Sequence, residues 1–138
     1  MKWELRNATS EDVPVIEAVA LREQLDSRDP RPEQFVMAEL NGEVVGFGRI
    51  IGHRDCWEVA CMYVARDLRR LGLGSDIVQE LFSRMNEDLP VYAVTSLPEF
   101  FGTLGFAPVK KVPAAIRAKL DYCRGAFDDE VAVMCRQG

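Results

Sequence analysis

A short basic run, Arg69-Arg70-Leu71-Gly72-Leu73-Gly74, stands between an apolar segment, residues 59–64, and an amphipathic one, residues 77–85. The apolar segment predicts a strand and the amphipathic segment predicts a helix, so the run between them predicts a strand-to-helix turn. The first amides of a helix lack intrahelical partners and lie at the positive end of its dipole. Glycines allow close backbone approach, and arginines pair with phosphate oxygens. The segment therefore predicts a phosphate-binding turn in an α/β fold.

The spacing of this run excludes the common nucleotide loops. A P-loop requires a lysine after its last glycine, and Ser75 follows Gly74. The dinucleotide fingerprint requires a third glycine where Ile77 stands. Taken alone, the run fits an ordinary turn with a solvated pair of arginines equally well.

Composition limits the class of protein. The chain has 138 residues, a net charge of −5 and a pI near 4.9, which predicts one domain, residues 1–138, without a nucleic-acid surface. No apolar run is long enough for a membrane span. His53 is the only histidine and no Cys-x-x-Cys pair occurs, so we expect no metal site and reduced thiols in a cytoplasmic protein.

Periodicity and turn signals along the chain predict alternating strands and helices. Asn41-Gly42 is a strong hairpin signal between two of the strands. The expected strands are residues 3–8, 35–40, 43–52, 56–64, 90–95 and 130–136, with residues 106–112 extended. The first expected helix is capped by Thr9 or Ser10 and has apolar positions from 13 to 20. The other expected helices cover residues 75–86, 98–104 and 113–123.

Three segments in order resemble the Gcn5-related N-acetyltransferase family. Arg69-x-x-Gly72-x-Gly74, with Val64 five residues before it, resembles the acyl-coenzyme A signature of that family. Residues 97–106 resemble its Ala-x-x-Phe-Tyr-x-x-x-Gly-Phe segment, and residues 41–46 resemble its second and third strands. The resemblance covers about residues 1–112. It implies an α+β acyltransferase fold with a mixed, mostly antiparallel, twisted sheet flanked by helices.

A narrower resemblance points to the amino-acid acetyltransferases of the N-acetylglutamate synthase type. Residues 58–64 resemble their Ala-Glu-Leu-x-x-x-x-Val segment. The tail, residues 112–134, resembles their Leu-Pro … Cys … Cys-x-Glu-x-Ala-Met ending, although Cys123 is the only cysteine in the right region.

Glu58 is the candidate general base. Acetyl transfer requires a neutral amine, and a positioned carboxylate can remove the proton. Glu58 interrupts an apolar strand, alternates to the same face as Met62, and matches a glutamate that is the base in some family members. Burial between Trp57 and Val59 predicts a raised pKa. The alternative is a structural glutamate at a strand end, exposed or paired with Arg54.

The resemblance also assigns the acetyl-coenzyme A contacts. The loop amides hold the pyrophosphate, the backbone near Met62 meets the thioester carbonyl, and Val64 pairs with the pantetheine arm; for both residues core packing is the alternative. The predicted cofactor-binding residues are Met62, Val64, Arg69, Arg70, Leu71, Gly72, Leu73, Gly74 and Ser75. Cys61 and Cys123 are not assigned as nucleophiles.

One position departs from the family. Phe101 stands where a tyrosine usually protonates the leaving thiolate, so that proton comes from water or another tyrosine, or no acid is used. Tyr63 and Tyr92 are the alternatives, although packing in the sheet is the simpler interpretation of each.

Other polar side chains have weaker cases. Thr95 and Ser96 are weaker candidates for cofactor contact, and His53 is expected to be a turn residue rather than a base. Arg22 and Arg49 suit a substrate carboxylate, but ordinary surface charge is the favoured interpretation of both.

The sequence thus predicts an N-acetyltransferase that moves acetyl from acetyl-coenzyme A directly to a primary amine of a small molecule, with an amino acid as the first guess. A catalytically weak coenzyme A-binding sensor or partner module is one alternative, which Phe101 favours. Acetylation of a protein lysine or N-terminus is the other. A homodimer is compatible with the sequence.

Overall fold

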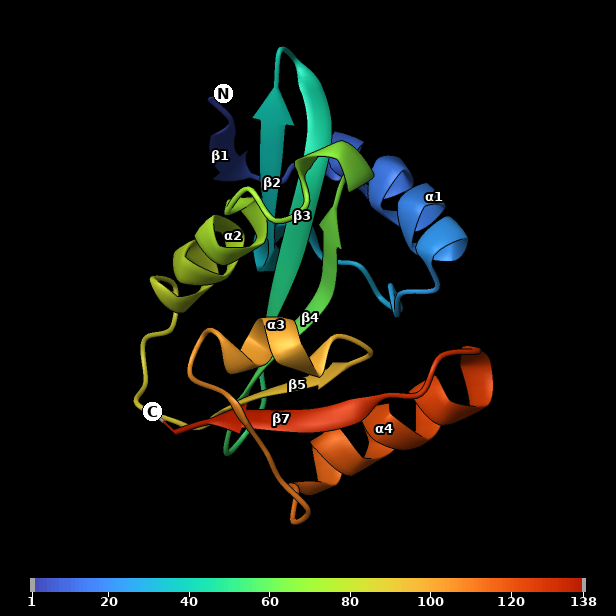
Figure 1. Cartoon of the computed structure of the whole chain (residues 1–138), viewed down its shortest axis with the longest axis vertical. Coiled ribbons are helices and arrows are strands. Elements are labelled where there is room, and N and C mark those ends of the chain that lie inside the picture. The colour runs from blue at the N-terminus through green and yellow to red at the C-terminus, as the bar shows by residue number, and fades with distance from the viewer. Residues whose placement is uncertain (1, 138) are drawn as a thin grey trace. The chain divides into compact units, whose positions relative to one another are not determined.

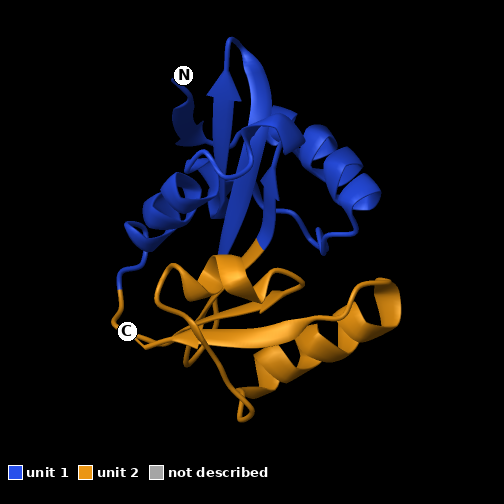
Figure 2. Cartoon of the chain, viewed as in Figure 1, with its two compact units in different colours: residues 1–50, 61–86 blue, residues 51–60, 87–138 orange. Residues whose placement is uncertain are grey.

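The computed structural model describes residues 2–137, which form two compact units (Figure 2). The first unit comprises residues 1–50 and 61–86, and the second comprises residues 51–60 and 87–138. Met1 and Gly138, the ends of the expected single domain, lie outside the described residues. The single domain, residues 1–138, stays a prediction.

The chain has the mixed order of strands and helices that the periodicity predicted (Figure 1). The strands are β1 (Glu4–Asn7), β2 (Phe35–Leu40), β3 (Glu43–Gly52), β4 (Trp57–Val64), β5 (Val91–Thr95), β6 (Ala107–Pro108) and β7 (Ala132–Arg136). The α-helices are α1 (Val13–Glu23), α2 (Leu73–Phe82), α3 (Pro98–Gly102) and α4 (Ala114–Ala126). Strands β2, β3 and β4 follow one another before α2. Short 3-10 turns are η1 (Ser10–Asp12), η2 (Pro32–Gln34) and η3 (Arg66–Leu68).

Strand pairing confirms the expected mixed, mostly antiparallel sheet. In the first unit β1 pairs with β2, and β2 with β3, both antiparallel. In the second unit β4 pairs in parallel with β5 at Trp57↔Val91 and Glu58↔Tyr92, and β7 pairs antiparallel with both β5 and β6. The order of hydrogen-bonded neighbours is β1-β2-β3-β4-β5-β7-β6, and β4 contributes residues to both units.

The hairpin between β2 and β3 follows the prediction to the residue. Asn41 and Gly42 have φ values of 52° and 80°, the pair of left-handed residues that a type I′ turn requires. The predicted strands 35–40 and 43–52 are β2 and β3. Local turn chemistry therefore sets the register of this hairpin.

Helices α1 and α2 cover opposite faces of the strands of the first unit (Figure 1). Gly46 and Gly48 of β3 face α2, where Ile77 packs against both. Phe47 between them alternates to the other face, where its ring packs on Tyr63, and the guanidinium of Arg22 from α1 lies 5.8 Å from the Tyr63 ring centre. The buried stripe of α2 is Leu73, Ile77, Val78 and Leu81.

Gly46 has no room for a side chain. A Cβ added there would lie 2.9 Å from the backbone carbonyl oxygen of Tyr63, which cannot rotate away. We expect Gly46→Ala to destabilise the protein by about 1–3 kcal/mol in urea denaturation, the usual cost of overpacking. Gly125→Ala in α4 is the matched control, because nothing lies within 4 Å of that Cβ. An unchanged midpoint for Gly46→Ala would contradict the close approach of β3 to β4.

The second unit has its own apolar cluster. Helix α4 contributes Ile116 and Leu120, which pack with Cys56 and Val133 and are all at most 8% exposed. Burial raises the pKa of the Cys56 thiol to about 12, so this thiol stays protonated and acts as a small apolar group.

No helix within residues 2–137 is long and apolar enough to cross a membrane.

Several predicted boundaries were wrong by a few residues. Helix α2 begins at Leu73 rather than Ser75 because Gly72, with φ of 96°, makes the helical turn possible two residues earlier. It ends at Phe82 rather than Asn86. The hydroxyl of the next residue, Ser83, donates to the Glu80 carbonyl and so competes with the backbone hydrogen bonds of the helix. Phe82 and Met85 are consequently half-buried instead of completing the apolar stripe.

The C-terminal elements also differ in length. The predicted helix 113–123 extends to Ala126, and the expected extended segment 106–112 pairs only at Ala107 and Pro108 among the described residues. The last strand begins at Ala132 rather than residue 130.

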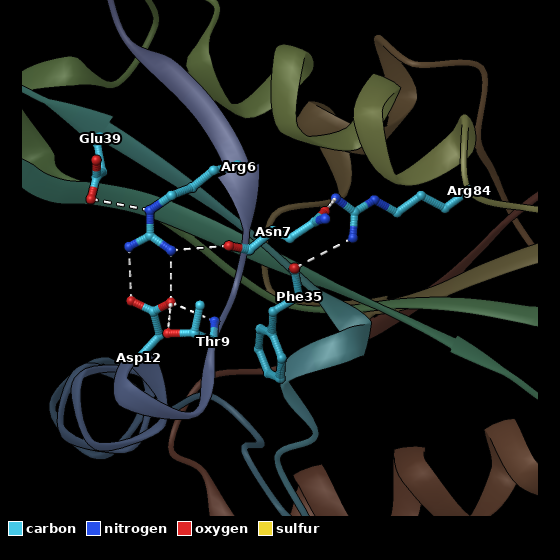
Figure 3. Close-up of polar contacts among 7 residues, drawn as sticks. All are labelled: Arg6, Asn7, Thr9, Asp12, Phe35, Glu39 and Arg84. Atoms are coloured by element: carbon cyan, nitrogen blue, oxygen red, sulfur yellow. Dashed lines mark hydrogen bonds and ion pairs between the residues drawn. The ribbon is translucent and has the colours of Figure 1, made fainter.

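A polar network ties β1 to the start of α1 in the first unit (Figure 3). The Arg6 guanidinium donates to both oxygens of Asp12 at 2.7 and 2.9 Å and pairs with Glu39 at 3.1 Å. Asp12 also accepts the Thr9 amide at 2.8 Å, which satisfies a donor ahead of the helix. On the other side of β1, Arg84 donates to the Asn7 side chain and to the Phe35 carbonyl.

Asp12 gives a pH-dependent prediction. Its hydrogen bonds from Arg6 hold its pKa below the ordinary value of 3.8, although burial opposes them. A carboxylate with a lowered folded-state pKa stabilises the fold above its unfolded pKa, and this contribution is lost as the pH falls through the folded pKa. We expect Asp12→Asn to cost about 1–3 kcal/mol at pH 7 in urea denaturation, and this cost should shrink as the pH falls through the folded-state pKa of Asp12. A cost independent of pH would contradict the ion pair.

Candidate active site

The predicted phosphate-binding turn is an exposed loop held at both ends by buried leucines. Leu68 and Leu73 are 6% and 0% exposed, whereas residues 69–72 between them are all exposed. Arg70 and Gly72 both have left-handed backbones, with φ of 67° and 96°. The turn thus projects from the first unit while its ends are fixed in the core.

The amides at the start of α2 are available to an anion. Asp76 donates to the Gly72 carbonyl at 3.0 Å and forms the first bond of the helix. The amides of Leu73, Gly74 and Ser75 precede that bond, so no carbonyl of the helix accepts from them. They also lie at the positive end of the helix dipole. Since the Leu73 side chain is fully buried, only its backbone can contribute.

Arg69, a predicted cofactor-binding residue, also contacts the protein on both sides of the turn. Its Nε donates to the Val64 carbonyl at 3.0 Å, and its Nη2 lies 3.4 Å from Glu23 Oε1. The side chain therefore ties the turn to the end of β4 and to α1 instead of standing free above the helix. Arg70 and Leu71 are exposed, so the Arg70 guanidinium is the more available of the two.

Strand β4 has an unusual backbone at Cys61, whose φ is 50°. A non-glycine residue in the left-handed region is uncommon, and within a strand it breaks the alternation of side chains. The expectation that Glu58 and Met62 share a face assumed an unbroken strand and loses its basis here. Met62 packs toward α2, with its sulfur beside Gly48, and both Met62 and Val64 are half-buried.

Glu58 belongs to a buried charged cluster in the second unit. Its side chain is only 4% exposed. Oε1 lies 2.9 Å from His53 Nε2, and Oε2 lies 3.0 Å from Lys119 Nζ on α4. The contact with Lys119 is an ion pair without aligned hydrogen-bond geometry, so Oε2 accepts no hydrogen bond from residues 2–137. The predicted alternative partner, Arg54, is an exposed neighbour of His53 in the turn.

The expected rise in the pKa of Glu58 was wrong. Burial does raise its pKa, but the hydrogen bond from His53 and the positive charge of Lys119 lower it further, and the pKa lies below the ordinary value of 4.5. Glu58 is therefore a carboxylate throughout the neutral range. It supplies a permanent negative charge rather than a proton acceptor tuned near pH 7.

Sequence reasoning missed both partners of Glu58. His53 was assigned to the turn alone, and Lys119 was not considered. Lys119 carried a signal, because it lies on the same helical stripe as the buried Ile116, Leu120 and Cys123. A lysine on an apolar stripe indicates a buried ion pair, since an isolated buried charge is costly.

The two candidate arginines differ. Arg49 is 5% exposed and donates to the Gln34 side chain and to the carbonyls of Arg28 and Asp29, so it is neither a surface charge nor available to a substrate carboxylate. Arg22 is exposed, and its Nη2 lies 3.4 Å from the Tyr63 hydroxyl.

The side chains considered above for the leaving thiolate or for the cofactor mostly have structural contacts. Phe101 is 4% exposed, with its ring centre 5.1 Å from those of Phe100 and Phe106. Burial raises the pKa of Tyr92, which pairs with Cys135 in the sheet. The Thr95 hydroxyl accepts from the Leu97 amide at 2.9 Å and so has a local structural role.

Within the described part of the chain, no group of three or more His, Cys, Asp or Glu side chains is placed to hold a metal ion. The structure brings together two groups of candidate residues, the exposed turn before α2 and the buried cluster of Glu58, His53 and Lys119.

Comparison with known proteins gives a family match and a curated relative. The model of the acetyltransferase (GNAT) family matches residues 2–106. The amino-acid acetyltransferase of Ectopseudomonas mendocina (strain ymp) is 29% identical in an alignment covering 88% of this chain and 32% of that protein. The chain thus spans about a third of the length of the curated relative that it matches.

Solved structures share the fold. N-acetylglutamate synthase from Neisseria gonorrhoeae, complexed with coenzyme A and N-acetyl-glutamate, superposes with a TM-score of 0.80 at 22% identity over 99% of this chain and 35% of that chain. Rv2747 from Mycobacterium tuberculosis, in complex with CoA and NLQ, gives a TM-score of 0.75 at 22% identity over 98% of this chain and 99% of that chain.

Proposed function

Because this chain belongs to the acetyltransferase (GNAT) family, we propose that it transfers an acetyl group from acetyl-coenzyme A to a primary amine of a small molecule. The single observation that carries the proposal is the exposed turn of residues 69–72, which leads into the unpaired amides of α2. A helix N-terminus with free amides suits a phosphate group. An acetyltransferase of this family takes its acetyl group from acetyl-coenzyme A, so we assign the diphosphate of coenzyme A to this site.

The contacts with coenzyme A divide between backbone and side chains. The amides of residues 72–75 hold the diphosphate, with Arg70 as the added charge. Arg69 supports the turn through Val64 and adds its remaining donors. The backbone of β4 at Met62 and Val64 contacts the thioester and the pantetheine arm. The left-handed backbone of Cys61, next to Met62, supports this assignment, because such conformations are concentrated at functional sites.

Transfer proceeds by direct attack of the amine on the thioester carbonyl. An alkylamine has a pKa near 10.4, so at pH 7 about 4–5 kcal/mol is needed to form its neutral state. We propose that Glu58 supplies the negative charge on which removal of that proton depends. Its lowered pKa keeps it ionised at the working pH, and its burial keeps the charge effective.

An amino acid is the acceptor that the relatives favour. The Ectopseudomonas relative is called an amino-acid acetyltransferase, and the Neisseria structure contains N-acetyl-glutamate. Both proteins are about three times as long as the part that this chain matches, so the acceptor is proposed by class only. Arg22, which is exposed beside Tyr63, is the candidate contact for its carboxylate.

Release of free thiol from acetyl-coenzyme A tests the function. The purified protein is incubated with acetyl-coenzyme A and a panel of amino acids, polyamines and lysine peptides. We expect thiol release with at least one small amine. Binding of coenzyme A without turnover of any amine would favour the sensor module, and turnover of peptides alone would favour protein acetylation.

A cytoplasmic location is part of the proposal. The cysteines at positions 56, 61, 123 and 135 are all buried, and buried thiols fit a reducing compartment. The sequence is compatible with a homodimer, and sedimentation velocity measures the oligomeric state directly.

A further inference from the structure

The buried cluster around Glu58 contains a histidine for which the proposed reaction has no role so far. His53 follows β3, Glu58 lies in β4, and Lys119 comes from α4, so three separate elements of the second unit meet there. The turn closes through backbone, since the His53 amide donates to the Cys56 carbonyl at 2.8 Å. The imidazole is therefore not needed to form the turn.

Both oxygens of Glu58 already face another side chain. Oε1 lies 2.9 Å from His53 Nε2, and Oε2 lies 3.0 Å from Lys119 Nζ. The side chains of Glu58 and Lys119 are 4% and 9% exposed, whereas that of His53 is 23% exposed. The imidazole is therefore the most exposed to solvent of these three side chains.

The contact with Glu58 also decides which ring nitrogen is basic. An ionised carboxylate only accepts hydrogen bonds, so Nε2 of His53 carries the hydrogen that lies between them. In a neutral imidazole the other nitrogen, Nδ1, is then the acceptor. A carboxylate that fixes the tautomer and stabilises the cation is the general arrangement for a histidine that accepts protons.

We propose that His53 accepts the amine proton at Nδ1 and that Glu58 is a positioning residue acting through it; this rests on the acetyl transfer proposed above. Nδ1 takes one proton from the ammonium form of the substrate, and the neutral nitrogen then forms a bond to the carbonyl carbon of the thioester; the second proton lost by the nitrogen goes to the departing sulfur. The carbon–sulfur bond breaks, and its electron pair leaves on the coenzyme A thiolate. The imidazolium then returns the proton to solvent, and Glu58 remains a carboxylate throughout.

The charges around His53 fit this role. Glu58 is in direct contact from β4, Lys119 stands behind that carboxylate on α4, and Arg54 and Asp55 follow His53 in the exposed turn. Lys119 and His53 contact different oxygens of Glu58, Oε2 and Oε1. Lys119 therefore orients the carboxylate and leaves Oε1 to the imidazole.

Two substitutions at His53 test the proposal. His53→Gln keeps an N–H donor for Glu58 but has no basic nitrogen, and His53→Ala opens space for added imidazole. We expect both to lower kcat by about 100-fold or more at pH 7, the usual effect of losing a general base, with the KM for acetyl-coenzyme A unchanged. His53→Gln should keep the Tm, because its amide replaces the donor to Glu58, whereas His53→Ala leaves that buried oxygen without this donor and should lower the Tm. We expect imidazole in the assay to restore much of the kcat of His53→Ala. Arg54→Ala, a change in the same turn, is the control and should retain wild-type kcat.

The outcomes separate this proposal from the proposed function. Wild-type kcat in His53→Gln, or no rescue of His53→Ala by imidazole, would overturn the role of His53 while acetyl transfer stands. Absence of thiol release by the wild-type protein with every amine would overturn both.

Discussion

Gly74→Glu is expected to abolish binding of coenzyme A. Gly74 is the second residue of α2, and its amide is among those left unpaired ahead of Asp76. A glutamate there places a negative charge beside the predicted diphosphate and competes for the same amides. Loss of two charge-assisted hydrogen bonds, at about 1.5–3 kcal/mol each, weakens binding by about 100- to 10,000-fold. Titration calorimetry with coenzyme A measures this directly.

A Tm measured beside the titration shows whether the variant stays folded, and two features of the helix favour the substitution. Glutamate is a better helix former than glycine, and a negative charge in the first turn of a helix is favourable. Gly125→Glu is the matched control, because it adds the same side chain and charge in α4 where nothing crowds the position. Binding by Gly74→Glu with wild-type affinity would refute the assignment of the turn.

Glu58→Gln is expected to lower turnover by about 100-fold or more at pH 7 and far less at pH 9. The pKa of Glu58 lies below 4.5, so it is ionised at both pH values and its own titration does not intervene. What changes is the amine, whose neutral fraction rises about 100-fold between these pH values when its pKa is near 10.4. An equal loss at both pH values would contradict a role in deprotonation.

Stability needs a control here, because Glu58→Gln removes the anionic oxygen 3.0 Å from the buried Lys119 amine. Replacing one member of a buried ion pair is destabilising, whereas replacing both with uncharged groups costs much less. We therefore expect the double variant Glu58→Gln, Lys119→Met to have a higher Tm than Glu58→Gln alone. Turnover that returned together with the Tm would show that the loss was structural.

Features that depend on neighbouring residues could be predicted from the sequence. The hairpin at Asn41 and Gly42 was placed to the residue because both positions adopt the left-handed backbone of a two-residue turn. The turn after β4 was located because an apolar run, a basic glycine-rich segment and a helical stripe follow one another. Its end was missed: α2 begins at Leu73 rather than Ser75, directly after the left-handed Gly72.

Features that depend on distant residues could not be predicted. Glu58 was identified, but the direction of its pKa was wrong because Lys119 lies 61 positions later in the chain and the pairing needs the folded unit. Arg49 looked like a surface charge, yet Arg28 and Asp29 turn their carbonyls toward it and bury it. The left-handed backbone of Cys61 has no local signature, since cysteine rarely adopts it.

Amide chemical shifts during a titration with coenzyme A test most directly whether the turn before α2 holds the diphosphate. We predict that the amide protons of residues 72–75 move downfield in proportion to occupancy, as expected for amides that donate to phosphate oxygens. Perturbations confined to other parts of the chain, at saturating coenzyme A, would contradict the account.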